Sequence, residues 1–303
     1  MAEWSAEVEV DEELVRRLLR SQFPALELDS VRPLAEGWDN AVWVVDERWA
    51  FRFPRRAIAI GGVERELAVL PRLAPLLPLP IPAPAFRGAP ADGYAWPFFG
   101  APLLPGGELS DVPLTDAQRV GLGRPLARFL RALHAPATAA AIEAALPADP
   151  NARTDMGRRV PRTAEALAEA RSLGLWQAPP TVQALLDAAR ALPPTRPSAL
   201  VHGDLHFRHL LVDDAGRLTG VIDWGDLCRA DPSVDLSVYW SVLPPAGRRD
   251  FVAEYGKPAE EQLVRARVLA LCLCAILAVY GHREGMAAVE REAIEGLRRA
   301  ATD

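Results

Sequence analysis

Short runs of Val, Trp and Phe alternate with turn residues over residues 31–53. This spacing is typical of strands that each bury one face, and it predicts three antiparallel strands with a first turn at residues 36–40. Residues 61–74 then place apolar side chains at helical spacing, and four prolines between residues 78 and 84 prevent that helix from continuing. Two further strands fit residues 85–88 and 94–99.

From residue 115 onward, apolar positions recur mainly at helical spacing, and Pro125 should kink or divide the first of these helices. Short strands fit residues 200–201, 210–212 and 218–222, with a turn at 213–216. The stretch 100–107, which has two prolines and three glycines, is the best candidate for a linker. We therefore expect an α+β chain with a β-rich lobe over residues 1–102 and a larger, mainly helical lobe over residues 103–303.

Charge and composition narrow the classes of partner. The chain has 303 residues, 34 of them basic and 40 acidic, and the basic residues form only short pairs. This balance argues against nucleic acid and anionic membranes as partners. The longest apolar run, residues 268–280, is shorter than the roughly 20 residues that span a bilayer, so it predicts a buried core helix.

The three cysteines, Cys228, Cys272 and Cys274, form no even framework and are expected to be reduced core residues. Residues 1–13 are acidic and lack the basic and apolar segments of a signal peptide. We therefore expect a cytoplasmic protein, monomeric or weakly dimeric.

Candidate chemistry is concentrated in residues 201–223, which hold three of the five histidines and four aspartates. Phosphoryl transfer needs a carboxylate near the attacking hydroxyl, metal ligands for the phosphates and a cation, all held in place. Asp204 and Asp223 lie before and after the predicted hairpin, so the hairpin can fold both towards one metal-phosphate site. Leu211 and Ile222 beside them would form the floor of a purine pocket.

Three motifs in this half resemble the aminoglycoside phosphotransferase family, which has a protein-kinase-like fold. His202-Gly203-Asp204 is similar to its catalytic loop, Asp223-Trp224 to its metal-binding motif, and residues 231–236 to the helix start that follows. The resemblance covers nearly the whole chain and implies a bilobal kinase-like fold. It implies that Asp204 is catalytic, that Asp223 binds Mg²⁺, and that His202 and Asp235 are structural, Asp235 by bracing the catalytic loop.

The amino-terminal half also resembles the family, whose third strand usually carries a Lys that contacts phosphates. This chain has Arg52 there, which keeps the charge but presents a planar fork. Its expected partner is Glu66, with Glu64 the weaker choice. The remaining expected nucleotide contacts are in the first turn and at the start of the linker: Gly37, Asp39, Asn40, Ala101 and Leu103. The donor is expected to be ATP or GTP.

His209 stands five residues after Asp204, where the family usually has an Asn metal ligand. Imidazole is a softer ligand than an amide oxygen and suits zinc or copper better than magnesium. Macrolide phosphotransferases are similar in carrying histidine at this point, so the change is compatible with an active enzyme. We expect His209 to help Asp223 hold the metal.

Other readings of the same residues stay open. His202, Asp204, His206 and His209 could form a metallohydrolase cluster on one face of a strand. His206 could orient the loop or face solvent, and His134 is expected to serve packing. Trp240 and Asp226 are candidates for contact with the acceptor, and an acidic cleft would suit a polyamine.

The function expected from these patterns is transfer of the γ-phosphate to a hydroxyl of an antibiotic, an aminoglycoside before a macrolide. Two alternatives remain: a kinase of a small metabolite, and a nucleotide-binding pseudokinase that has lost transfer. The departures at Arg52 and His209 motivate the second alternative, because fold alone does not guarantee activity.

Overall fold

The computed structural model describes residues 6–37, 39–91, 93–142 and 146–302. The chain divides into two compact units. Unit 1 comprises Met1–Pro75, Pro80–Leu104 and Trp224–Leu227, and unit 2 comprises Leu76–Leu79, Pro105–Asp223 and Cys228–Asp303. The division we expected after residue 102 therefore lies two residues before the observed one, and the sequence patterns did not assign residues 224–227 to the first unit.

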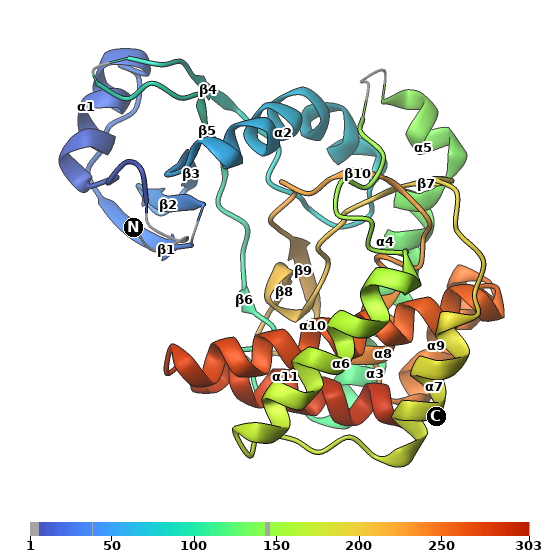
Figure 1. Cartoon of the computed structure of the whole chain (residues 1–303). Helices are drawn as coiled ribbons and strands as arrows, with labels where there is room; N and C mark the ends of the chain where they lie inside the picture. Colours follow the sequence, from blue (N-terminus) through green and yellow to red (C-terminus); the bar gives the residue numbers. More distant parts are fainter. Residues whose placement is uncertain (1–5, 38, 92, 143–145, 303) are drawn as a thin grey trace. The chain divides into compact units, whose positions relative to one another are not determined.

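Unit 1 is built on an antiparallel sheet with strand order β1-β2-β3-β5-β4 (Figure 1). The three expected strands are confirmed, as is the helix that follows them. Its elements are α1 (Glu12–Gln22), β1 (Val31–Glu36), β2 (Asn40–Val45), β3 (Trp49–Pro54), η1 (Ala57–Ala59), α2 (Ile60–Leu73), β4 (Phe86–Gly88) and β5 (Phe98–Pro102).

An aromatic cluster fills the core of unit 1. Phe51 and Phe53 of β3 are fully buried, and the Phe53 ring stacks on Phe98 with 4.7 Å between centroids. Gly100 faces the Phe51 ring so closely that a Cβ would lie 2.4 Å from it. Only glycine fits there, which fixes the pairing of β5 with β3.

One strand of unit 1 corrects the sequence-based expectation. We placed it at residues 94–99, but β5 spans Phe98–Pro102, while Tyr94 forms only an isolated bridge with Ala91. Pro97 has no N–H to donate to a ladder, so the strand begins after it. The start of the expected linker is consequently a buried strand.

Unit 2 is mainly helical. Its helices are η2 (Ala74–Leu76, which overlaps the unit boundary), α3 (Asp116–Gly121), α4 (Gly123–His134), α5 (Pro136–Ala141), α6 (Met156–Ser172), α7 (Pro180–Arg190), η3 (Phe207–His209), α8 (Ser237–Ser241), α9 (Pro245–Tyr255), α10 (Glu260–Arg283) and α11 (Ala287–Ala301). The division expected near Pro125 falls at Leu122, between α3 and α4. Pro125 itself lies in the first turn of α4, where its missing N–H is not needed.

Five short strands of unit 2 lie in or beside residues 201–223, the segment with the candidate chemistry. β7 (Ala199–Val201) pairs with β10 (Cys228–Ala230), and β8 (Leu210–Val212) pairs with β6 (Gly107–Glu108) and β9 (Leu218–Val221). The strands expected at 200–201, 210–212 and 218–222 are confirmed. β6 and β10 were not predicted, because strands of two or three residues carry no periodicity and form only where a partner edge lies beside them.

Helix α10 is long and apolar enough to cross a membrane by composition, and it is the one such helix among the described residues. Its most apolar window is 67% buried within the protein, and it packs against α6, α7, α8 and α11 of the same unit (Figure 1). Cys272 and Cys274 are free, buried thiols on this helix. This burial matches the core helix expected from the apolar run.

Candidate active site

The loop of residues 202–209, which we expect to be the catalytic loop, follows β7 and is bound by one buried carboxylate. Asp235 accepts hydrogen bonds from the backbone N–H of His202 at 2.8 Å and of Gly203 at 3.0 Å. Gly203 has a φ of +93°, a conformation that glycine adopts without the clash of a Cβ. The residue before Asp204 is thus fixed by a side chain 32 positions away.

Asp235 is in turn held by α4. The Nε2 of His134 lies 3.1 Å from Oδ2 of Asp235, and its Nδ1 lies 2.8 Å from the hydroxyl of Tyr255. Burial acts to raise the pKa of Asp235, but the interactions with His134 and His202 together outweigh it, so the pKa is lowered. We expected His134 only to pack against its neighbours. The sequence did not reveal its contact with Asp235, because no local pattern links positions 134 and 235.

His202 is a second brace of the same loop. Its Nε2 lies 2.9 Å from the carbonyl of Ile222, and its Nδ1 accepts the N–H of Asp204 at 3.3 Å. Burial lowers the pKa of His202 to about 4, so the ring is neutral near pH 7. The first of these bonds connects the loop to the residue that follows β9, and the second lies within the loop.

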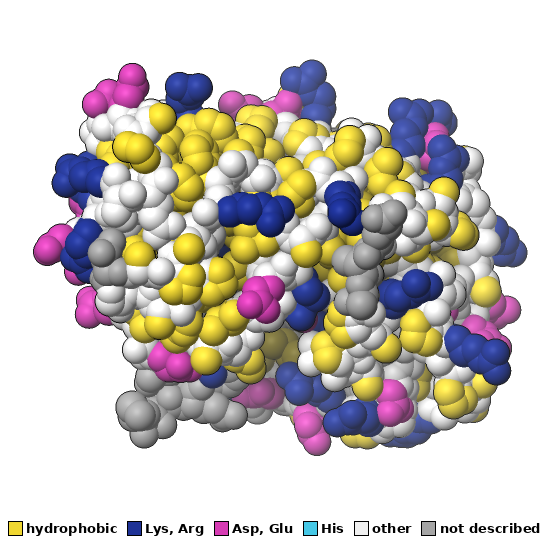
Figure 2. Space-filling view, turned by 90° about the horizontal axis from the view of Figure 1, so that it is seen from above, with side chains coloured by type: hydrophobic (Ala, Val, Ile, Leu, Met, Phe, Trp, Pro, Cys, Tyr) yellow, Lys and Arg dark blue, Asp and Glu magenta, His cyan; other side chains and the backbone are white. Residues whose placement is uncertain are grey.

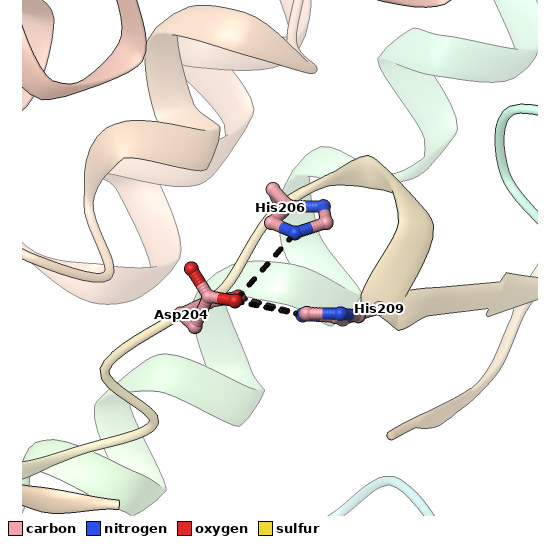
Figure 3. Close-up of side chains that lie close together, drawn as sticks. All are labelled: Asp204, His206 and His209. Atoms are coloured by element: carbon pink, nitrogen blue, oxygen red, sulfur yellow. Dashed lines mark hydrogen bonds and ion pairs between the residues drawn. The ribbon is translucent and has the colours of Figure 1, made fainter. Parts of the chain in front are cut away.

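Asp204 lies beside two imidazole rings (Figure 3). Its Oδ2 is 3.7 Å from Nε2 of His206 and 3.9 Å from Nδ1 of His209. The Asp204 side chain is 37% exposed, whereas that of His206 is 8% exposed. The carboxylate is therefore the accessible part of this group.

The tautomer of His209 follows from its partner. Nδ1 lies 2.7 Å from the backbone carbonyl of Asp204, and a carbonyl can only accept, so Nδ1 carries a proton. Nε2 of His209 lies 3.5 Å from Oδ2 of Asp223. In the neutral ring, a nitrogen lone pair and a carboxylate then face one another, which is an arrangement that favours a cation.

Asp223 follows β9 with an unusual backbone. Its φ is +63°, the left-handed region that few residues other than glycine adopt. The N–H of the preceding Ile222 is donated to the carbonyl of His209, which ties this bend to the catalytic loop. Such strain persists where surrounding contacts enforce it, and it is concentrated at functional sites.

These residues also permit a test of the metallohydrolase reading. Among the described residues, Asp204, His206 and His209 have ligand atoms within 4.8 Å of one another. However, Nδ1 of His206 accepts the N–H of Arg208 at 3.2 Å, so in the neutral ring Nε2 carries the proton. With no lone pair directed at Asp204, His206 is not arranged as a zinc ligand. The oxygen donor of the kind that Mg²⁺ prefers is instead the Asp223 carboxylate, with the Nε2 of His209 3.5 Å from it.

Unit 1 contains the expected ion pair of Arg52 with Glu66. Nη1 of Arg52 lies 3.2 Å from Oε1 of Glu66, a fully buried side chain, while Glu64 is exposed. Oε1 of Glu66 also accepts the N–H of Trp224 at 3.2 Å, and Arg65 donates to the carbonyl of Gly225 at 2.6 Å. Two adjacent residues of α2 thus bind the segment that follows Asp223.

The first turn is described except for Trp38, which lies outside the described residues. The N–H of Gly37 is donated to the carbonyl of Asn40 at 2.9 Å, so this N–H is already used within the turn. The carboxylate of Asp39 lies 2.9 Å from Arg56. Contact of this turn with nucleotide phosphates stays a prediction.

The other residues expected to bind the nucleotide have these positions. Ala101 is buried in β5, and the N–H of Leu103 is donated to the carbonyl of Arg48. Leu211 is buried in β8, and Ile222 is partly buried after β9. Their contact with a purine stays a prediction.

The two acceptor candidates, Trp240 and Asp226, belong to different units. The indole N–H of Trp240 is donated to the carbonyl of Leu263, and the guanidinium groups of Arg248 and Arg267 each lie 4.5 Å from its ring centroid. Asp226 belongs to the segment 224–227 of unit 1 and is partly buried. These contacts give Trp240 a structural role, and contact of either residue with an acceptor stays a prediction.

On the face drawn in Figure 2, basic and acidic side chains are scattered among apolar ones. This distribution matches the short basic pairs in the sequence, which gave no reason to expect binding of a polyanion.

Solved structures with similar folds are phosphotransferases. The GDP and kanamycin complex of APH(2")-IIia has a TM-score of 0.66 and 25% identity, covering 94% of this chain and 97% of that one. The GDP complex of wild-type aminoglycoside 2'-phosphotransferase-IIIa has a TM-score of 0.67 and 24% identity over 96% and 99%. A macrolide 2'-phosphotransferase from Brachybacterium faecium has a TM-score of 0.60 and 24% identity over 93% and 97%. The expected α+β, kinase-like fold is thereby confirmed.

Sequence comparison gives the family. An uncharacterized protein of Bacillus subtilis strain 168, YcbJ, is 46% identical over 46 residues, which is 15% of each chain. The profile described as the phosphotransferase enzyme family matches residues 30–269. Because this match covers most of the chain, the protein belongs to the phosphotransferase enzyme family.

Proposed function

We propose that this protein transfers the γ-phosphate of ATP or GTP to a hydroxyl of an antibiotic, with an aminoglycoside as the first candidate. The observation that carries the proposal is the position of His209 between two carboxylates. It lies 3.9 Å from Asp204 and 3.5 Å from Asp223. A group that accepts a proton and a group that holds a cation are therefore neighbours in unit 2.

In this reaction Asp204 orients the acceptor hydroxyl and takes its proton, because it is the accessible carboxylate of the loop. The hydroxyl oxygen forms a bond to the γ-phosphorus as the bond to the β-γ bridging oxygen breaks, and the nucleoside diphosphate leaves. Asp235 and His202 bond to the backbone and hold the loop in place, and His134 holds Asp235. No covalent intermediate with the enzyme is needed.

Asp223 and His209 would hold Mg²⁺. When bound, the cation would supply neutralisation of the phosphate charge. Nδ1–H of His209 is anchored on the carbonyl of Asp204, which keeps Nε2 directed at Asp223. The geometry is the kind of outer hydrogen bond that orients a histidine ligand.

Arg52 is proposed to bind phosphate oxygens, with Glu66 orienting its guanidinium. Gly37, Asp39, Asn40, Ala101, Leu103, Leu211 and Ile222 are proposed nucleotide contacts. The similar structure at 25% identity is a GDP complex, which supports a purine nucleotide as donor.

Two observations support an aminoglycoside acceptor before a macrolide. The formal net charge of -6 suits a polycation, since complementary charge speeds encounter. One similar structure, at 25% identity, is a complex with kanamycin. His209 is the feature that favours the macrolide alternative.

A transfer screen over aminoglycosides, macrolides and primary metabolites, with ATP and GTP as donors and Mg²⁺ present, tests the proposal. Phosphorylation of an aminoglycoside is the expected outcome. Transfer to a metabolite alone would replace the acceptor class, and binding of nucleotide without transfer to any acceptor would favour the pseudokinase.

A further inference from the structure

His206 is the one histidine of the catalytic loop to which the proposed reaction gives no role. Its ring is buried, two residues after Asp204, and a buried polar ring needs partners for both nitrogens. One nitrogen faces the backbone and the other faces Asp204.

The backbone partner fixes the proton on this ring. His206 is the N-cap of η3, and its Nδ1 accepts the N–H of Arg208 at 3.2 Å. An amide N–H can only donate, so Nδ1 presents its lone pair and Nε2 carries the proton. His206 and His209 are therefore opposite tautomers, although their ring centroids are only 3.9 Å apart.

The Nε2–H of His206 points to Oδ2 of Asp204 at 3.7 Å (Figure 3). This separation is about 0.5 Å longer than a hydrogen bond of roughly 3.2 Å. The His206 ring is held by Arg208 and packed on His209, whereas the Asp204 side chain is partly exposed. A small rotation of Asp204 would close the gap, and catalytic hydrogen bonds often shorten only when substrate is bound.

We propose that His206 is a positioning residue for the catalytic aspartate. Its Nε2–H donates to Oδ2 of Asp204 in the reacting state, so that the other carboxylate oxygen accepts the proton of the acceptor hydroxyl. This inference rests on the proposed role of Asp204. His209 cannot replace His206 in this role, because its Nδ1–H is donated to a backbone carbonyl.

Two amide substitutions test the roles of the two His206 nitrogens one at a time. In His206→Asn the amide oxygen lies near the position of Nδ1 and can accept the N–H of Arg208, but nothing replaces Nε2. In His206→Gln an amide N–H₂ reaches the position of Nε2, while the cap is weakened. His282→Asn is the matched control, because His282 is an exposed histidine of α10 whose Nδ1 contacts Glu290.

We expect His206→Asn to lower kcat roughly 10- to 100-fold, the loss typical of a misplaced reacting group, with little change in the nucleotide KM or in Tm. His206→Gln should recover part of that loss in spite of a lower Tm. In an Asp204→Asn background, His206→Asn should cause no further loss, since the pair acts as a unit. Wild-type kcat in His206→Asn, or the same fold loss in both backgrounds, would overturn the inference.

A measurement that does not depend on activity separates this inference from the proposed function. Nitrogen-15 NMR of the wild-type protein at pH 7.5 should show His206 protonated on Nε2 and His209 protonated on Nδ1, and Asp204→Asn should move the His206 Nε2–H resonance. His206 protonated on Nδ1, or a resonance that Asp204→Asn leaves unmoved, would refute the positioning role even in an active enzyme. If the wild-type protein transfers no phosphate, the proposed function is wrong and the kinetic comparison cannot be made. The NMR spectra alone then test the contact between His206 and Asp204.

Discussion

The ion pair of unit 1 and the catalytic loop of unit 2 hold their charged groups in different ways. Arg52 pairs with an opposite charge, Glu66. In the loop, the partners of His202, His206 and His209 include backbone groups, at Ile222, Arg208 and Asp204. A charge pair sets the position of a cation, whereas a backbone donor or acceptor also decides which nitrogen carries the proton. Proton transfer needs control over which nitrogen carries the proton.

The largest effect is expected at Asp204. Asp204→Asn keeps the shape of the side chain but removes its basicity, so turnover should fall at least ~100-fold. Nucleotide affinity should be unchanged, because Asp204 is not proposed as a nucleotide ligand. Steady-state kinetics and calorimetric titration with nucleotide check both parts. Turnover within a few-fold of wild type would remove Asp204 from its catalytic role.

Asp223 should differ from Asp204 in affecting binding as well as turnover. We expect Asp223→Ala to weaken metal-nucleotide binding roughly 10- to 100-fold, the loss seen when a metal site is perturbed. The measurement is calorimetric titration of nucleotide at several Mg²⁺ concentrations.

The backbone at Asp223 supplies a control for this result. Because its φ is +63°, Asp223→Gly should lose the metal as Asp223→Ala does, yet be more stable than the alanine variant by about 1 kcal/mol. Urea denaturation compares the two. If the alanine variant is as stable as the glycine variant and retains Mg²⁺-dependent binding, both the strain and the ligand assignment are wrong.

Breaking the ion pair of unit 1 should have a smaller effect. Glu66→Gln keeps the size of the side chain but removes its charge, and a charge-assisted hydrogen bond is worth about 1.5 kcal/mol or more. We expect kcat/KM for the nucleotide to fall about 10-fold. Glu64→Gln, on the exposed face of the same helix, is the matched control and should resemble wild type. Equal losses in the two variants would mean that the pair does not orient Arg52.

The smallest effect concerns stability in mild acid. The folded-state pKa of His202 is about 4, below the reference value of about 6.5, so only the unfolded chain gains a proton as pH falls through this window. The contribution of His202 to the free energy of unfolding is fully present above pH 6.5 and is lost as the pH falls towards 4. Between pH 7.5 and 5.5, this histidine should reduce the free energy of unfolding by about 1 kcal/mol.

Urea denaturation at the two pH values measures this loss. His202→Asn should be less stable at pH 7.5 but should lose less on acidification, while His282→Asn should keep the wild-type pH dependence. An unchanged pH dependence in His202→Asn would assign the acid sensitivity to other groups.

Elements with strong periodicity and motifs with fixed spacing could be predicted from the sequence alone. The meander of unit 1, helix α2 and the β8–β9 hairpin were all predicted, because alternation and helical spacing are local properties. The order of the motifs around Asp204, Asp223 and Asp235 indicated the family, and the profile match confirms it. The pairing of Arg52 with Glu66, expected with the resemblance to the family, is also present.

Contacts between residues that lie far apart in the chain could be known only from the folded structure. The contact of His134 with Asp235 spans 101 residues, and that of Glu66 with the N–H of Trp224 spans 158. The pairing of β6 and β10 depended on neighbouring edges rather than on their own few residues. The opposite tautomers of His206 and His209 were equally hidden, because a histidine's proton is placed by the group that its ring meets in the folded chain.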